Sequence, residues 1–170
     1  MKDIVLLYEN CCIYEITILT YFLKATESNL IYCSLDGRNI TAMEGYTIIP
    51  DAALSEISLS EVRSFIVPGG DISNIGQDIV YDCLKTLQKA GVLIGGICAG
   101  VDVLERAGLL HNIHSTREDA FDCVLDKNIV TARANAYVDF AIETAKALDL
   151  FEDEADLMET IAFWKEFKRA

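Results

Sequence analysis

Short β-rich segments alternate with helix-length amphipathic segments along this chain, and this alternation constrains the fold more than any other feature of the sequence. Strands are expected over 4–8, 30–35, 46–49, 64–67, 91–97, 121–125 and 128–131, the last two as a hairpin or strand pair. Helices are expected over 15–27, 72–89, 100–107, 136–148 and 152–169. Strands that alternate with helices pair in parallel and carry helices on both faces. The sequence therefore predicts an α/β three-layer sandwich around a mostly parallel sheet, with ligands bound beyond the carboxyl ends of the strands.

Length and charge narrow the class of protein further. A chain of 170 residues, 52% of them apolar, fits one domain over residues 1–170 with a sizeable core. The net charge is −13, and no cluster of Lys or Arg offsets it, so neither nucleic acid nor an anionic membrane surface is an expected partner. The first residues include Asp3 and too short an apolar run for a secretion signal. We therefore expect a cytoplasmic protein that acts on a small molecule.

The six cysteines are expected to be reduced thiols. The sequence contains no Cys-x-x-Cys pair, which makes a zinc site or a disulfide framework an unfavourable interpretation. We expect no bound metal and no cofactor. A cysteine with a chemical role is then expected where the backbone setting is unusual.

Cys98 occupies that setting, in the run Gly-Ile-Cys-Ala-Gly over 96–100, where a strand turns at once into a helix. Flanking glycines permit the tight, strained turn of a nucleophile elbow, and the helix N-terminus favours a thiolate. The alternative is a buried, inert cysteine between two glycines. The turn over 68–70 ends a neighbouring strand and, together with the N–H of Ala99, can supply the donors of an oxyanion hole.

The segments 65–70, 96–100 and 131–133, followed by Phe140 and Ala141, resemble the ThiJ/PfpI superfamily, a group with the flavodoxin-like fold of class I glutamine amidotransferases. The resemblance covers nearly the whole chain in the right order. It implies a homodimer, with Cys98 as nucleophile, Glu15 as its proton partner, and the backbone N–H groups of Gly70 and Ala99 as oxyanion donors. From position alone, Glu15 is equally an acid that complements a helix N-terminus.

The sequence departs from the superfamily at several positions. Ala99 stands where protease-like members carry His, and no His follows His114, so peptidase and glutaminase activities are not expected. His114 is either a third member of the site or an exposed loop residue. Arg133 matches a family arginine near the pocket, or it is a surface cation, and Glu44 replaces a second arginine.

Cys12 lies in the loop that follows the first strand, close in sequence to Glu15. It is either a resolving thiol for an oxidised Cys98 or a partly buried small residue. We also expect a protonated Glu15 to donate a hydrogen bond to Cys98 and make this thiol acidic.

Two functions fit these residues. The first is a cysteine-dependent hydrolase, hydratase or glyoxalase-type lyase that acts on a reactive carbonyl or similar electrophilic carbon. The second is a non-enzymatic stress protein that senses oxidants through Cys98. Both use Cys98 and Glu15, so the sequence does not separate them.

Overall fold

Seven strands form the central sheet of the computed structural model, which describes residues 1–169. Across the sheet they are β5 (Ala52–Ala53), β2 (Asn29–Ser34), β1 (Lys2–Leu6), β6 (Val62–Val67), β7 (Leu93–Ile97), β9 (Ile129–Ala132) and β8 (Cys123–Asp126). All neighbours pair in parallel except β8 and β9, which form an antiparallel hairpin. The predicted mostly parallel sheet is confirmed, including the strand pair near residues 121–131.

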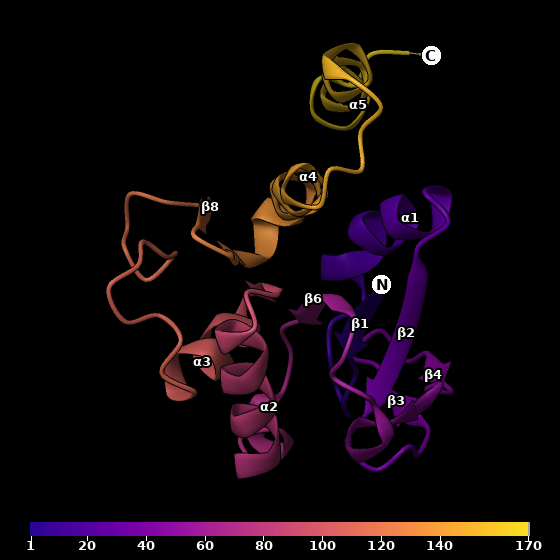
Figure 1. Cartoon of the computed structure of the whole chain (residues 1–170). Coiled ribbons are helices and arrows are strands. Elements are labelled where there is room, and N and C mark those ends of the chain that lie inside the picture. The colour runs from indigo at the N-terminus through magenta and orange to yellow at the C-terminus, as the bar shows by residue number, and fades with distance from the viewer. Residues whose placement is uncertain (170) are drawn as a thin grey trace.

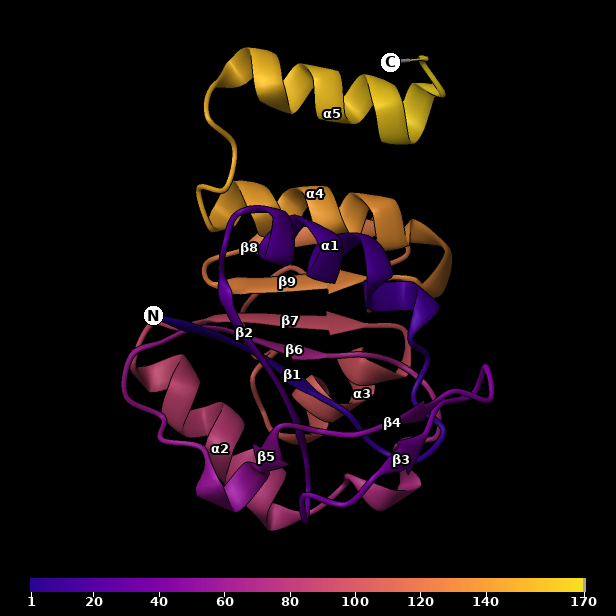
Figure 2. The same ribbon diagram turned by 90° about the vertical axis from the view of Figure 1, so that its right-hand side faces the viewer.

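Helices cover both faces of this sheet, as Figures 1 and 2 show. On one face lie α1 (Thr17–Ala25) and α4 (Tyr137–Ala147), and on the opposite face lie α2 (Asp78–Lys89) and α3 (Ala99–Arg106). A fifth helix, α5 (Glu154–Glu166), packs outside α4 and has no fully buried residue. The three-layer sandwich is thereby confirmed. None of the helices in residues 1–169 combines the length and apolar character that a bilayer crossing requires.

Several element boundaries differ from those predicted. The strand expected over 46–49 is β4 (Thr47–Ile48), which pairs with β3 (Ile40–Thr41) in a separate small hairpin. Its neighbours Tyr46 and Ile49 are largely exposed, whereas a strand of the central sheet would bury such side chains. The helix expected over 72–89 begins as a 3-10 turn, η3 (Ile72–Asn74), and becomes α-helical only at Asp78, after Gly76.

The helix expected over 15–27 also starts as a 3-10 turn, η1 (Tyr14–Ile16), before α1. The 3-10 turns η2 (Leu54–Glu56) and η4 (Ala134–Ala136) precede β6 and α4. The last helix ends at Glu166, because Phe167 has a left-handed backbone.

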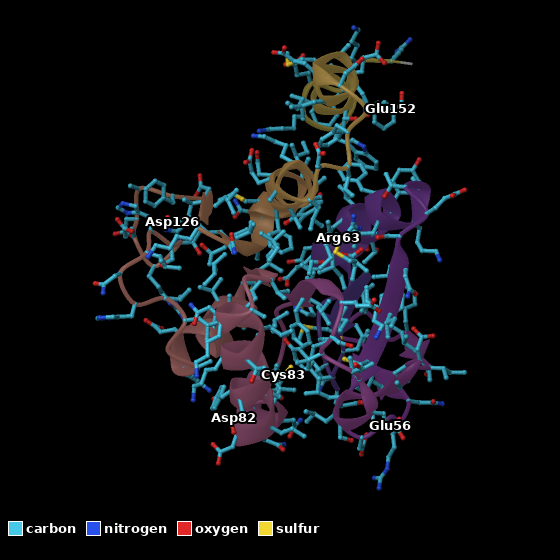
Figure 3. All side chains as sticks on the ribbon, in the orientation of Figure 1. Glu56, Arg63, Asp82, Cys83, Asp126 and Glu152 are labelled. Carbon is cyan, nitrogen blue, oxygen red and sulfur yellow. The ribbon has the colours of Figure 1, made fainter. Side chains whose placement is uncertain are left out.

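A buried polar cluster ties together the amino ends of the central strands. Asp3 is fully buried and accepts hydrogen bonds from Arg63 Nε at 3.1 Å and Ser64 Oγ at 2.7 Å, and a further one from Ser28. Burial opposes ionisation of Asp3, but these bonds and the Arg63 charge outweigh it and hold the pKa of the carboxyl below its usual range. Arg63, which Figure 3 labels near the middle of the molecule, therefore binds at the amino ends of the strands. This is the end of the sheet opposite the carboxyl ends.

The chain diverges in opposite directions from the adjacent strands β1 and β6. From β1 it crosses through α1 to β2, and from β6 it crosses through α2 to β7. Such a divergence leaves a crevice outside the carboxyl ends of the two strands, which is the usual ligand position in open α/β sheets. In Figure 2 the arrowheads of β6, β7 and β9 point toward this edge, where β3 and β4 also lie.

Candidate active site

Cys98 stands at the turn between β7 and α3 with a strained backbone. Its φ is 55° and its ψ is −124°, values that residues other than glycine rarely adopt. Its N–H donates to the carbonyl of Ala132 at 2.9 Å, which fixes the turn against β9. The side chain is exposed, whereas the other five cysteines are buried or partly buried. The backbone therefore presents this thiol to solvent at the carboxyl edge of the sheet.

Gly100 allows the close approach that the turn requires. A Cβ atom on Gly100 would lie 2.1 Å from the carbonyl oxygen of Val67 and 2.9 Å from that of Pro68. A Cβ atom on Gly96 would instead meet Leu104 Cδ1, at 2.7 Å, which is the end of a flexible side chain. Gly96 therefore tolerates an added methyl group better than Gly100 does, although the two glycines are equivalent in the sequence motif.

We expect Gly100→Ala to lower the free energy of unfolding by at least about 3 kcal/mol, because its methyl group collides with main-chain oxygens that cannot move independently. Gly96→Ala is the matched comparison, and overpacking against Leu104 is expected to cost about 1–2 kcal/mol. Urea denaturation of both variants measures the difference. Equal stability of Gly100→Ala and the unmodified protein would contradict the elbow geometry.

Glu15 faces Cys98 across Gly69. The Glu15 side chain is 1% exposed, and its Oε2 accepts the N–H of Gly69 at 2.7 Å. A Cβ atom placed on Gly69 would lie 2.6 Å from both Glu15 Oε2 and Cys98 Cβ, and 3.0 Å from Cys98 Sγ. The carboxyl and the thiol therefore border the same small space, which only a glycine leaves open. The structure brings these two predicted residues together.

The predicted oxyanion donors are the backbone N–H groups of Gly70 and Ala99. Residues 10–12 and 69–71 form a short antiparallel bridge through Cys12 N–H to Gly69 O at 2.8 Å and Asp71 N–H to Asn10 O at 3.1 Å. This bridge does not use the N–H of Gly70, whose φ is 125°. The N–H of Ala99, at the start of α3, hydrogen-bonds the sulfur of Cys98. Ala99 therefore donates directly beside the thiol, and the role of both N–H groups as oxyanion donors stays a prediction.

The electrostatics of the pair differ from the expectation of an acidic thiol. Burial raises the pKa of Glu15, and hydrogen bonds from Gly69, Cys98 and Tyr14 only partly oppose this effect. Burial also raises the pKa of the Cys98 thiol, because the surrounding protein removes part of the hydration of a thiolate even at an exposed position. The negative charge of Glu15 raises it further, and the Ala99 N–H lowers it. An ionised Glu15 therefore opposes ionisation of Cys98, and the expected acidic thiol requires a protonated Glu15.

Cys12 lies in the wall of the site. It is buried, its Sγ lies 3.7 Å from Met43 Sδ, and its N–H is bonded to Gly69. Burial, followed by the charges of Glu15 and Glu44, raises the pKa of its thiol to about 12. Cys12 is therefore a neutral neighbour of the pair at neutral pH.

His114 does not reach Cys98. Its N–H donates to Asp126 Oδ2 at 2.7 Å, and its Nδ1 lies 2.9 Å from Glu118 Oε1. Asp126, labelled in Figure 3, pairs with Ile129 at one end of β9, whereas Cys98 is bonded to Ala132 at the opposite end. The interpretation of His114 as a third member of the site is therefore wrong, because the loop over 108–122 carries it to the far edge of the sheet.

The Arg133 side chain is held by the segment that precedes β8. Arg133 follows Ala132 directly, and its Nε donates to the carbonyl of Phe121 at 3.1 Å and lies 3.3 Å from Asp122 Oδ1. Asp119 pairs with the same guanidinium at 3.6 Å. The charge of the predicted pocket arginine is thus paired with two carboxylates.

The sequence analysis missed two residues of the site. Gly69 is the spacer between the carboxyl and the thiol, and it is the middle residue of the predicted turn over 68–70. Tyr14 precedes Glu15, and its hydroxyl donates to Glu15 Oε1 at 3.4 Å, while its ring packs edge-on against Tyr137 at 5.8 Å. In the sequence, only its position next to Glu15 indicates that Tyr14 belongs to the site.

A cavity of about 620 Å³ lies elsewhere, between α1, α4 and α5. Aromatic side chains line much of it, among them Tyr21, Phe22 and Trp164, and none of the site residues above belongs to it. No cysteine and no residue with a positive φ is among its lining residues, so the candidate active site is placed at Cys98 rather than in this cavity.

Comparisons with known proteins show which proteins this chain resembles. The model of the DJ-1/PfpI family matches residues 1–147. The uncharacterized protease YoaZ of Bacillus subtilis is 29% identical over 148 residues, which cover 75% of this chain and 70% of that protein. The glutathione-independent glyoxalase DJR-1.2 of Caenorhabditis elegans is 33% identical over 100 residues, or 58% of this chain and 52% of that protein. The crystal structure of the DJ-1 superfamily protein Atu0886 from Agrobacterium tumefaciens superimposes with a TM-score of 0.84 at 24% identity, and covers 99% of this chain and 100% of that one.

Proposed function

The chain belongs to the DJ-1/PfpI family, and from that premise we propose that it is a cysteine-dependent enzyme acting on small reactive carbonyl compounds. One observation carries the proposal: the exposed Cys98 thiol and the buried Glu15 carboxyl face each other across Gly69. A nucleophile with a proton partner and two nearby N–H donors is the minimum set for addition to a carbonyl carbon. The similarity to a glutathione-independent glyoxalase favours α-oxoaldehydes as the substrates.

The first chemical step is addition of Cys98 to the aldehyde carbon. The thiol proton passes to Glu15, the sulfur forms a bond to carbon, and the electron pair of the carbonyl π bond moves to oxygen. The N–H groups of Gly70 and Ala99 stabilise the resulting oxyanion. Proton return gives a neutral hemithioacetal, with no net change in oxidation state.

Conversion of this adduct to product needs only proton transfers and one water molecule. Glu15 removes the proton from the former aldehyde carbon, and the resulting enediol is protonated on the neighbouring carbon to give a thioester on Cys98. Water cleaves the thioester, which releases an α-hydroxy acid and restores the thiol. The sum is α-oxoaldehyde plus water to α-hydroxy acid, which needs no external oxidant or reductant. A carboxyl whose pKa is raised by burial is suited to this alternation between acid and base.

Peptidase and glutaminase activities have less support. Ala99 follows the nucleophile, and His114 is held at the far edge of the sheet by Glu118 and Asp126. Expulsion of an amine from a tetrahedral intermediate needs a general acid at the leaving group, and a histidine usually serves there. The site residues described above include no histidine.

The test is to incubate the protein with methylglyoxal and follow lactate by proton NMR. We expect catalytic turnover without added glutathione, since Cys98 supplies the thiol. Absence of lactate from several α-oxoaldehydes, with a folded protein and a free Cys98 verified by mass, would overturn the proposed reaction.

Oxidant sensing through Cys98 is the second candidate, favoured by the exposure of this thiol alone among the six. Peroxide would convert the thiol to a sulfenic and then a sulfinic acid, whose oxygens could accept a hydrogen bond from a protonated Glu15. Titration with peroxide, followed by peptide mass, measures this. Sulfinate formation without any turnover of carbonyl compounds would favour sensing over catalysis.

We propose a homodimer as the assembled form, by analogy with the superfamily that the sequence resembles. Static light scattering is expected to give about twice the chain mass of 18.8 kDa at micromolar concentration. A mass equal to that of one chain would rule out any mechanism that uses residues of a second copy.

A further inference from the structure

We propose that the Cys98 site selects neutral or cationic electrophiles over anionic ones, and that Glu44 is the residue that sets this preference. The inference rests on the proposed function, since it names the charge class of the substrate. It concerns the rim of the site rather than the reacting groups.

Glu44 belongs to a chain of contacts that leads to Cys98. It lies in the turn between β3 and β4, and its Oε1 accepts the N–H of Tyr14 at 2.8 Å. In the same turn the N–H of Met43 donates to the carbonyl of Cys11 at 2.9 Å. The next residue, Cys12, is bonded to Gly69, the spacer beside the thiol. The small hairpin is thus attached to the rim of the site, in agreement with its place at the carboxyl edge in Figure 2.

Glu44 and Glu15 bring two carboxylates to the same short segment. Glu44 is bonded to the backbone of Tyr14, and the hydroxyl of Tyr14 is bonded to Glu15, the following residue. Glu44 is exposed, and Tyr14 is 46% exposed, so this wall of the site faces solvent. An incoming molecule therefore meets the Glu44 carboxylate before it reaches the buried pair.

Two arginines that follow Cys98 in the sequence are bound to acidic side chains. Arg133 is bound to Asp119, Asp122 and the Phe121 carbonyl. Arg117 is paired with Asp102 and with Glu105, the latter at 3.0 Å. The charge of Glu44 raises the pKa values of Glu15 and Cys12, and the charge of Glu15 raises that of Cys98.

An anionic substrate is therefore repelled by the Glu44 carboxylate. For a carboxylate about 8 Å away, at an effective dielectric constant between about 40 and 80, Coulomb's law gives roughly a threefold change in rate for each unit of charge. A neutral α-oxoaldehyde such as phenylglyoxal escapes this penalty, whereas 4-carboxyphenylglyoxal, with one carboxylate on its ring, does not.

The test compares two alkylating reagents that differ only in charge, iodoacetamide and iodoacetate. Cys98 labelling is measured by peptide mass at low salt, and the ratio of the two rates is compared with that of a neutral small thiol. Because both reagents attack the same thiolate, any change in the thiol pKa cancels in the ratio. The variants are Glu44→Gln, which keeps an acceptor for the Tyr14 N–H, and Glu9→Gln. Glu9 is the matched control, because it is an exposed carboxylate that accepts the N–H of Thr41 at 2.9 Å in the same hairpin.

We expect the unmodified protein to prefer iodoacetamide more strongly than the reference thiol does. Glu44→Gln should lower that preference about threefold, and Glu9→Gln should leave it nearly unchanged. The difference should vanish at about 1 M NaCl, where the Debye length is about 3 Å. A preference equal to that of the reference thiol, an unchanged ratio in Glu44→Gln, or a Cys98 that neither reagent labels would each overturn the inference.

Turnover of phenylglyoxal and of 4-carboxyphenylglyoxal separates this inference from the proposed function, because both are α-oxoaldehydes that the proposed reaction converts to α-hydroxy acids and only the second is anionic. If the labelling ratio responds to Glu44 but neither compound is turned over, the charge preference stands and the proposed reaction fails. If both compounds are turned over with equal kcat/KM, the proposed reaction stands and the charge preference fails.

Discussion

Replacement of Cys98 by Ser is expected to lower kcat/KM for α-oxoaldehydes by at least about 10³-fold. A serine hydroxyl at this strained position retains the geometry, but its proton is far less acidic than that of a thiol, and Glu15 is the only carboxyl placed to accept it in the described site. The measurement is steady-state turnover of methylglyoxal, with thermal unfolding as a check that the variant is folded.

The matched control for this variant is Cys83→Ala. Cys83 lies on α2, is buried, and burial raises the pKa of its thiol to about 11. It is labelled in Figure 3, beside Asp82. We expect a loss of stability of about 1 kcal/mol from the small cavity but an unchanged kcat/KM. Retained turnover in Cys98→Ser, or a comparable loss in Cys83→Ala, would show that another thiol or no thiol carries the reaction.

The elbow was predictable from sequence because its causes are local. A strand that turns at once into a helix around a cysteine needs glycines where Cβ atoms would strike the neighbouring strand, and Gly100 meets Val67 in that way. The alternation of strands and helices is likewise a short-range pattern, so the layers and the parallel sheet followed from it. The small β3–β4 hairpin did not follow from it, since a strand of two residues is too short to show an alternation of apolar and polar residues.

At the site, the sequence analysis failed for residues whose contacts form only in the tertiary structure. Nothing near His114 in the sequence reveals that Asp126 binds its backbone, or that this contact lies at the far end of β9. Arg133 was placed correctly along the chain, but Asp119 and Asp122 decide where its charge points. The position of Glu15 beside Cys98 came from the family resemblance, because residues 15 and 98 are far apart in the sequence and meet only in the folded protein.

The sign of the coupling between Glu15 and Cys98 depends on the charge of Glu15. Sequence reasoning gave a protonated Glu15 the role of a hydrogen-bond donor that makes the thiol acidic. In the folded protein the carboxyl already accepts the Gly69 N–H, and its charge raises the pKa of the thiol. A variant without that charge therefore separates the two accounts, because they predict opposite changes in thiol reactivity.

Glu15→Gln is expected to change labelling and turnover in opposite directions. The amide keeps an oxygen for the Gly69 N–H but carries no charge, so the pKa of Cys98 falls and its labelling curve moves to lower pH. Below the wild-type midpoint, iodoacetamide should then label Cys98 several-fold faster. Turnover of methylglyoxal should fall by roughly 10²–10⁴-fold, because the amide cannot carry protons between sulfur, carbon and oxygen.

Glu15→Asp provides the comparison, since it keeps the charge on a shorter side chain. We expect its labelling curve to stay closer to that of the unmodified protein, while its turnover lies between those of the unmodified protein and Glu15→Gln. Slower labelling in Glu15→Gln would restore the role of Glu15 as a donor to the thiolate. Unchanged labelling would mean that Glu15 is neutral at the pH of the measurement, since neither a protonated carboxyl nor an amide carries a charge. Faster labelling together with full turnover would leave Cys98 as the nucleophile and remove Glu15 from the proton transfers.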